Sequence, residues 1–134
     1  MTKSIAGAVA QVQTLAAALS GVRATPSHPT DSISVYPFAA SYIGAVETTK
    51  PSATLTISIY TIVTEIHISR KDMQRDITVL NAYPPAFTAA IWGDPTLAAT
   101  VDTVLTCTGL YTPLEWGGIE TRAWVFQTHC KITS

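Results

Sequence analysis

The sequence predicts an α+β fold, an antiparallel or mixed sheet of about four strands with helices packed on one face, in the order α-β-β-α-β-β. Residues 52–68 alternate apolar and polar side chains, which is the period of a half-buried strand. Residues 4–20 instead carry apolar groups three and four positions apart, as a helix does. A second helical stretch and two further alternating segments follow, and the 134 residues are enough for one domain, 1–134.

The long segment from Ser52 to Ile68 is expected to be the central strand of this sheet. It exceeds the usual strand length of about 5–6 residues, and β-branched residues fill it. Its apolar side chains change from odd to even positions near Tyr60 and Thr61. A slip of one residue inverts the faces of a strand. We therefore expect a β-bulge there, or a far half that presents its other face to a neighbour.

Two regions predict the helices. In residues 4–20, Ser4 is placed to cap the first turn. The next helix is expected to begin at Ser69, with Asp72 at the spacing of a capping box. Because proline interrupts a helix interior but is tolerated in a first turn, we expect a break at Pro84-Pro85. A further short helix would then run from about Pro84 to Trp92, with these side chains inward: Phe87, Ile91 and Trp92.

The remaining segments predict three strands and two long loops. Ile33–Phe38 is expected to be a short edge strand, and Thr100–Thr108 and Ile119–Ile132 complete the sheet. Ala39–Ser52, which contains Gly44 and Pro51, is predicted to be an extended loop, and so is Gly109–Gly118. Loops of this length in a compact domain are usually functional or mobile.

Charged residues make up 13% of the chain, about half the ~25% of an ordinary soluble domain. Hydrophobic residues reach 47%, and the net charge is −1. A small monomer of this composition exposes wide uncharged surface, which favours association. We therefore expect an oligomer or a component of an assembly, with a monomeric Ala/Thr-rich protein as the alternative. The sequence has no basic stripe, so it does not predict sequence-specific binding to nucleic acid.

The cysteines and the N-terminal region give only weak indications of a disulfide or a signal peptide. Cys107 and Cys130 lie in strand-like segments and are expected to be small buried hydrophobes, although a bridge is possible if their strands are adjacent. The region after Lys3 resembles a signal peptide only faintly, because Gln11 and Gln13 interrupt its apolar stretch. No segment predicts a membrane span, so we expect synthesis as a soluble protein in the cytoplasm.

Three histidines and one carboxylate are the candidates for chemistry. Glu65 and His67 share a face of the long strand, and a metal or acid–base site would form if His129 lay opposite them. His28 lies in a turn-rich linker. A zinc site needs three or four converging ligands, so we interpret these residues as solvated side chains on a strand. No nucleophile, phosphate-binding or dinucleotide-binding motif is present in the sequence. We expect no catalytic residues, no metal, no cofactor and no enzymatic activity.

The order of several short motifs resembles the tail terminator, or tail completion, proteins of bacteriophages with long non-contractile tails. Members of that family have an N-terminal helix, a strand with a Tyr-Pro pair as in Tyr36-Pro37, and a long strand that ends in a basic-acidic pair, as in Ser69-Arg70-Lys71-Asp72. An Asp-Pro-Thr-Leu turn follows, matched here by Asp94-Pro95-Thr96-Leu97. At Ala98-Ala99 this chain departs from the glycines that are common in the family. The resemblance covers nearly the whole chain.

This resemblance implies a structural virion protein. It implies a hexameric ring that caps the tail tube, ends tube polymerisation and joins the tail to the head-side connector, with a lumen that passes DNA. The partners would be other copies of the chain, the tail tube protein and the connector, with no small-molecule substrate and no membrane. We expect the two predicted loops to carry the partner contacts through five residues: Thr48, Thr49, Lys50, Tyr111 and Trp116.

Two other functions fit the same sequence. The chain could occupy a different neck or head-completion position in the virion, which the subunit count and the identity of its partner would distinguish. It could instead be a small ligand-binding or enzyme domain that uses Glu65, His67 and His129. That interpretation predicts a monomer or dimer whose stability responds to a metal or ligand.

Overall fold

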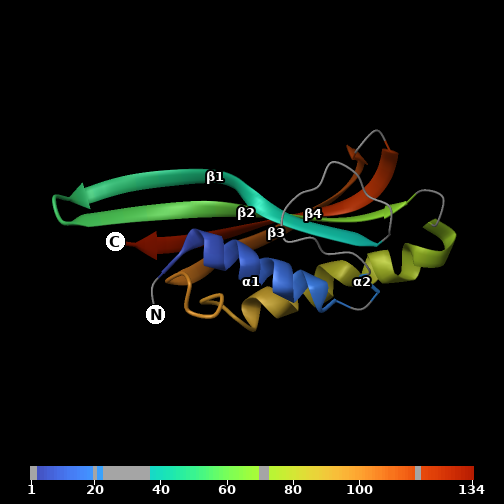
Figure 1. Cartoon of the computed structure of the whole chain (residues 1–134), viewed down its shortest axis with the longest axis horizontal. Helices are drawn as coiled ribbons and strands as arrows, with labels where there is room; N and C mark the ends of the chain where they lie inside the picture. The colour runs from blue at the N-terminus through green and yellow to red at the C-terminus, as the bar shows by residue number, and fades with distance from the viewer. Residues whose placement is uncertain (1–2, 20, 23–36, 70–72, 117–118) are drawn as a thin grey trace.

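A computed structural model describes residues 3–19, 21–22, 37–69, 73–116 and 119–134. It confirms the predicted α+β fold and the order of its elements. The six elements are α1 (Ile5–Ala17), β1 (Phe38–Ser52), β2 (Leu55–Ser69), α2 (Met73–Trp92), β3 (Thr103–Trp116) and β4 (Ile119–Thr133). The four strands form one antiparallel sheet in the order β1-β2-β4-β3 (Figure 1).

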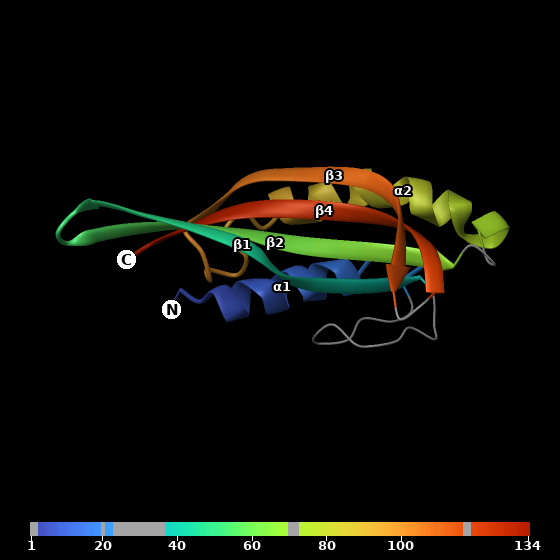
Figure 2. The same cartoon turned by 90° about the horizontal axis from the view of Figure 1, so that it is seen from above.

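Both helices lie on the same side of the sheet, α1 beside β1 and β2, and α2 beside β3 and β4 (Figure 2). We call the sheet face toward them the helix face and the opposite one the outer face. Even-numbered residues of β2 point to the helix face, and Ile62, Ile66 and Ile68 are fully buried there. The hydrophobic core therefore fills the layer between the sheet and the helices, as period-two alternation requires. Among the described residues, no helix is both long and apolar enough to cross a membrane.

The two predicted loops are strands, which corrects both predictions. Ala39–Ser52 belongs to β1, and most of Gly109–Gly118 belongs to β3, which continues to Trp116. The glycines and prolines that suggested loops are compatible with strands at the two edges of a sheet, where a proline costs no ladder hydrogen bond. Of the short strand predicted at Ile33–Phe38, Phe38 begins β1 and residues 33–36 lie outside the described residues.

The irregularity expected near Tyr60 and Thr61 lies in the neighbouring strand instead. β2 pairs with β4 without a register shift from Ile57 to Ser69, whereas β1 shifts between Ile43 and Ala45. A Cβ on Gly44 would lie 2.6 Å from Cγ2 of Val63, so glycine permits the close approach of the two strands at this bulge. The apolar side chains of β2 change phase instead at the point where the strand extends beyond the helices (Figure 1). Before that point, Ile57 and Ile59 lie on the outer face, and after it Ile62, Ile66 and Ile68 lie on the helix face.

Helix α2 is continuous, which corrects the break predicted at Pro84-Pro85. Four of its side chains, at spacings of three and four, are buried in the core: Leu80, Tyr83, Phe87 and Ile91. This packing holds the helix together where the prolines lack N–H donors. Trp92 was predicted to face inward, but it is 48% exposed. The capping pair predicted at Ser69 and Asp72 falls outside the described side chains.

Helix α1 follows its prediction closely. The Ser4 hydroxyl accepts a hydrogen bond from the Gly7 N–H, at 3.2 Å between Oγ and N, and so caps the first turn. Ala8, Val12 and Ala16 are fully buried against the sheet. Gln13 is buried with them, and its amide nitrogen donates to the Ala39 carbonyl of β1 at 2.9 Å. The helix is therefore attached to the sheet by a hydrogen bond as well as by apolar contact.

Between α2 and β3, three consecutive residues adopt left-handed backbone conformations. Leu97, Ala98 and Ala99 have φ of 48°, 58° and 66°. The Asp94 carboxylate accepts from the Ala98 N–H at 3.0 Å and from the Gln11 side chain at 2.9 Å, which fixes the turn against α1. Leu97 is fully buried beneath it. A residue with a Cβ is strained in this region by roughly 1–2 kcal/mol, so the turn is held by its hydrogen bonds and by Leu97.

Replacing Ala99 with glycine is expected to raise the free energy of unfolding by about 1 kcal/mol, because glycine adopts positive φ without strain. Ala99 is exposed, so the substitution removes little packing. The matched control is Ala89→Gly on the exposed side of α2, which should lower stability by roughly 0.5–1 kcal/mol. Urea unfolding of both variants tests the pair, and a destabilised Ala99→Gly protein would contradict the left-handed turn.

Candidate functional site

The residues predicted to contact partners lie at opposite edges of the sheet. Thr48, Thr49 and Lys50 are on β1 near the hairpin turn to β2, and all three are exposed. Tyr111 is on β3, 37% exposed, with its ring 5.7 Å from the ring of Trp124 in an edge-on arrangement. Trp116 ends β3, and its side chain lies outside the described part of the chain. The structure does not bring these residues together, because β1 and β3 are the two outermost strands.

The β1–β2 hairpin projects beyond the helices as an arm, residues 45–59, in which β4 still pairs with β2 as far as Ile57 (Figure 1). Every residue from Ile43 to Leu55 is exposed, including Val46 at 55% and Leu55 at 36%. A two-stranded hairpin is only marginally stable by itself. This one is supported along β2 by β4, because Thr56 and Ser134 exchange two backbone hydrogen bonds of 2.7 and 2.8 Å. The arm therefore presents apolar side chains away from the body of the molecule.

Sequence reasoning missed Ile43 and Val46 as candidate contact residues. Both were assigned to a loop, because Gly44 and Pro51 are strong turn signals. A signal was nevertheless present: Tyr42, Val46 and Thr48 are at even spacing and favour strands. Gly44 accounts for a bulge inside the strand instead of a turn.

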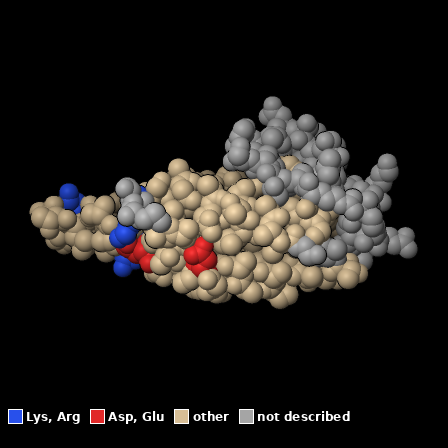
Figure 3. Space-filling view, turned by 60° about the horizontal axis from the view of Figure 1, so that its bottom comes forward, with Lys and Arg blue, Asp and Glu red and all other residues tan. Residues whose placement is uncertain are grey.

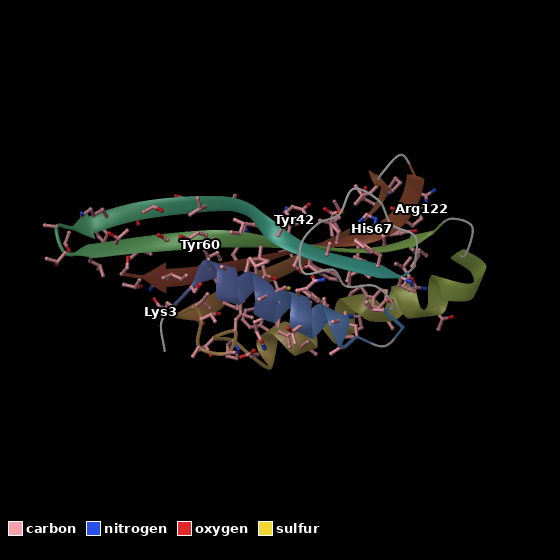
Figure 4. All side chains as sticks on the ribbon, in the orientation of Figure 1. Lys3, Tyr42, Tyr60, His67 and Arg122 are labelled. Atoms are coloured by element: carbon pink, nitrogen blue, oxygen red, sulfur yellow. The ribbon has the colours of Figure 1, made fainter. Side chains whose placement is uncertain are left out.

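A hydrogen-bonded chain of four polar side chains crosses the outer face from β1 to β4, and Figure 4 labels two of them, Tyr42 and His67. The Tyr42 hydroxyl donates to Oε2 of Glu65. Oε1 of Glu65 accepts from Nε2 of His67 at 2.9 Å, and Nδ1 of His67 lies 2.6 Å from the hydroxyl of Thr121. His67 is fully buried and Glu65 is 8% exposed. These groups satisfy one another in a place where an unpaired polar atom would be costly.

The buried position of this chain changes the titration of its members. Burial alone would raise the pKa of Glu65, but hydrogen bonds from His67 and Tyr42 outweigh it and hold that pKa below the ordinary value of 4.5. Burial, the hydrogen bond to Glu65 and the charge of Glu65 together raise the pKa of Tyr42 above its ordinary value. Glu65 is therefore an ionised acceptor, and Tyr42 remains a donor at neutral pH.

His129 does not lie opposite Glu65 and His67, which was the condition for a metal or acid–base site. The interpretation of Glu65 and His67 as solvated side chains is also wrong, because both are buried in a hydrogen-bonded chain on the outer face. Glu65 and His67 do share a face, as predicted, but His129 pairs with Thr61, four positions along β2 from Glu65. At about 3.3 Å per residue this is roughly 13 Å. Nδ1 of His129 instead lies 2.7 Å from the hydroxyl of Thr106. In the described residues no three His, Cys, Asp or Glu side chains gather as metal ligands would, and His28 is outside those residues.

Both cysteines are free thiols in the structure. Cys130 is fully buried, as predicted, and burial raises the pKa of its thiol to about 11. Cys107 is partly buried on β3, where it pairs with Thr128, two residues before Cys130. Residues in such a diagonal arrangement are about 7–8 Å apart, which is too far for a disulfide without backbone movement.

The surface carries few charges over the helix side of the molecule. Figure 3, which turns that side forward, shows Lys, Arg, Asp and Glu in small groups separated by wide uncharged areas. Lys3 contacts Asp102, and the hydrogen bonds that Asp102 accepts from Lys3 and Thr133 lower its pKa to about 2. The low charge of the sequence is therefore visible on the folded surface, where it favours association.

Comparison with known proteins adds no relative: no protein-family model and no curated protein matches this chain.

Proposed function

We propose that this chain is a structural virion subunit that forms a ring at the end of a phage tail tube. The ring ends tube polymerisation and joins the tail to the head-side connector. The observation that carries the proposal is the arm, residues 45–59, which projects exposed apolar side chains beyond a body with little surface charge. The proposal is also supported by the order of the sequence motifs, which resembles that of tail terminator proteins.

The arm fits this role because an exposed two-stranded hairpin is suited to contact with other protein surfaces. Apolar groups such as Val46 and Leu55 lose exposed area when a partner covers them, and this favours binding. The part of β1 near the hairpin turn carries Thr48, Thr49 and Lys50, whose polar groups suit the rim of an interface. We assign the arm to contacts within the ring and with the adjoining tail tube.

The expected result is a ring with the mass of a hexamer of the 14.3 kDa chain, formed alone or on addition of tail tube protein. Light scattering gives the mass, and electron microscopy of the same sample shows the ring. In a tube-growth assay, added protein should stop elongation. Protein that neither forms rings nor limits tube length would contradict the proposal. A rise in melting temperature with a metal or small ligand would then favour a ligand-binding domain.

A shortened arm tests which part of the molecule makes the contact. Deleting three residues of β1 alone would invert the faces of the strand beyond the cut. Replacing residues 48–58 with Asn-Gly avoids this, because it joins the paired residues Glu47 and Ile59 through a two-residue turn. This variant should keep its fold by circular dichroism and lose tube capping. Trp92→Ser, at an exposed position on α2, is the control and should cap tubes normally.

A further inference from the structure

The sheet has two edges, the outer sides of β1 and β3, and no described strand lies beyond either of them. An edge strand presents unpaired N–H and C=O groups that can pair with another chain. The antiparallel pairings make β1 and β3 run in opposite directions within the sheet. A β3 strand placed beside the β1 of another copy would therefore continue the same antiparallel pattern.

The backbone hydrogen bonds between the strands determine which N–H and C=O groups point outward. Thr56 and Ser134 exchange two bonds, so even-numbered residues of β2 bond to β4 and odd-numbered ones bond to β1. The β1 residues opposite even-numbered β2 residues therefore aim their N–H and C=O groups at the open edge. In β4, by the same alternation, even-numbered residues bond to β2 and odd-numbered ones bond to β3. The β3 residues opposite even-numbered β4 residues, Cys107, Gly109 and Tyr111, therefore aim their N–H and C=O groups at the other open edge. Pro113 fits this phase, because proline has no N–H to give to the ladder.

One part of the β1 edge is covered by the chain itself. The outward carbonyl of Ala39 accepts from the side chain of Gln13 in α1 at 2.9 Å. Farther along β1, Ile43, Val46 and Thr48 also aim their backbone groups outward, and all three residues are exposed. Lys50 and Pro51, which are typical of protected edges, lie at the hairpin end, and the bulge at Gly44 and the charged side chain of Glu47 lie between them and the body. The stretch from Ile43 to Thr48 has no described strand beyond it and is exposed throughout.

We propose that this open stretch of β1 pairs, antiparallel, with the Cys107–Tyr111 edge of β3 in a second copy of the chain. The inference rests on the proposed function, since a head-to-tail contact of this kind repeats from copy to copy and can close into a ring. Each copy then uses both of its edges. A contact between two β1 edges would use only one edge per copy and would stop at a dimer.

The side chains at the two edges match in chemistry. Val46 and Tyr111 both lie on the helix face, because they pair with Tyr60 of β2 and Trp124 of β4. They are 55% and 37% exposed in the single chain. A β-branched residue beside an aromatic one is a favourable cross-strand combination. The pairing therefore adds apolar contact to the main-chain hydrogen bonds that β-strand addition supplies.

Proline substitutions at outward positions test the pairing while sparing the ladder inside each copy. Val46→Pro and Tyr111→Pro each remove one outward N–H and leave the hydrogen bonds to β2 or β4 intact. Each variant alone is expected to have the mass of a monomer under conditions in which the wild type assembles. Mixed in equal amounts, they should form a heterodimer, because the mixture contains one unblocked β1 edge and one unblocked β3 edge.

Val46→Thr and Tyr111→Val are the controls, because they change the same side chains but keep the N–H; both should assemble like the wild type. Rings formed by either proline variant would overturn the edge pairing while leaving the proposed function standing. Homodimers of Tyr111→Pro alone would overturn it in favour of contact between two β1 edges. Conversely, wild-type rings that do not cap tubes would refute the proposed function and leave the pairing intact.

Amide hydrogen exchange gives a readout that does not depend on variants folding. In the wild-type assembly, the amides of Val46, Thr48, Gly109 and Tyr111 should exchange at least tenfold more slowly than in the monomer. The amides between them, such as Glu47 and Leu110, already bond within the sheet and should change much less. Uniform protection, or none, along both strands would overturn the proposal.

Discussion

Replacing Phe126 with alanine is expected to lower the free energy of unfolding by about 3–5 kcal/mol. Phe126 is 1% exposed, and its ring stacks on Phe87 of α2 with 4.4 Å between centroids. On β4 it also lies 5.9 Å from the ring of Trp124. Gly109 leaves room for it, since a Cβ there would lie 2.8 Å from the Phe126 ring. The ring therefore joins the sheet to α2, and its removal leaves a cavity between rigid elements.

Urea unfolding followed by circular dichroism measures this loss. Leu110→Ala is the matched control: Leu110 lies on the neighbouring β3 and is 66% exposed, so its truncation should change stability by less than about 1 kcal/mol. A Phe126→Ala protein as stable as the control would show that the contact between β4 and α2 is not part of the core.

Replacing Glu65 with leucine is expected to cost about 3–5 kcal/mol, the usual effect of removing one partner from a buried charged network. The substitution leaves the Tyr42 hydroxyl and Nε2 of His67 without their acceptor on the outer face. Thermal unfolding at neutral pH measures the loss. Glu65→Gln keeps an acceptor oxygen of nearly the same shape, so it should lose less than half as much. Equal losses in the two variants would contradict the hydrogen-bonded arrangement.

The same carboxylate predicts a dependence of stability on pH. The pKa of Glu65 in the folded state lies below its unfolded value, because His67 and Tyr42 donate hydrogen bonds to the ionised form. Its contribution is therefore fully present above the unfolded pKa, near 4.5, and is lost as the pH falls through the lower folded pKa. Melting temperatures between pH 7 and the acid limit should fall less steeply for Glu65→Gln than for the wild type. Parallel curves would exclude Glu65 as a contributor.

The periodicity of the chain determined its fold class. Alternation in β2 and β4 and the helical spacing in α1 come from side chains that must all reach one side of their own element. The patterns predict the structure correctly because they reflect which side chains are buried. Ile62, Ile66 and Phe126 are buried where the alternation places them. The shared face of Glu65 and His67 was predictable for the same reason, since positions two apart on a strand point the same way.

Only the tertiary structure decided whether the prolines and Gly44 end an element or lie within one. Gly44, Pro51 and Pro113 carry turn signals in the sequence, yet they lie in edge strands, where a bulge or a missing N–H costs little. Pro84 and Pro85 stay within α2 because their neighbours Tyr83 and Phe87 are held in the core. Local propensities are worth about 1 kcal/mol per residue, or about 3 kcal/mol for a proline inside a helix, and burial of the neighbouring side chains in the core exceeds them.

The register between neighbouring strands could not be predicted from the sequence either. Tyr42 and Thr121 meet the Glu65–His67 pair, while His129 lies elsewhere on the sheet, because the pairing of β1 and β4 with β2 fixes which side chains come close. Register depends on contacts between segments far apart in the chain, and no local pattern records it. The sequence by itself therefore determined the fold class, the order of the elements and the buried faces of α1 and β2. The tertiary structure decided how far the edge strands extend, which polar groups meet and which strand edges stay open.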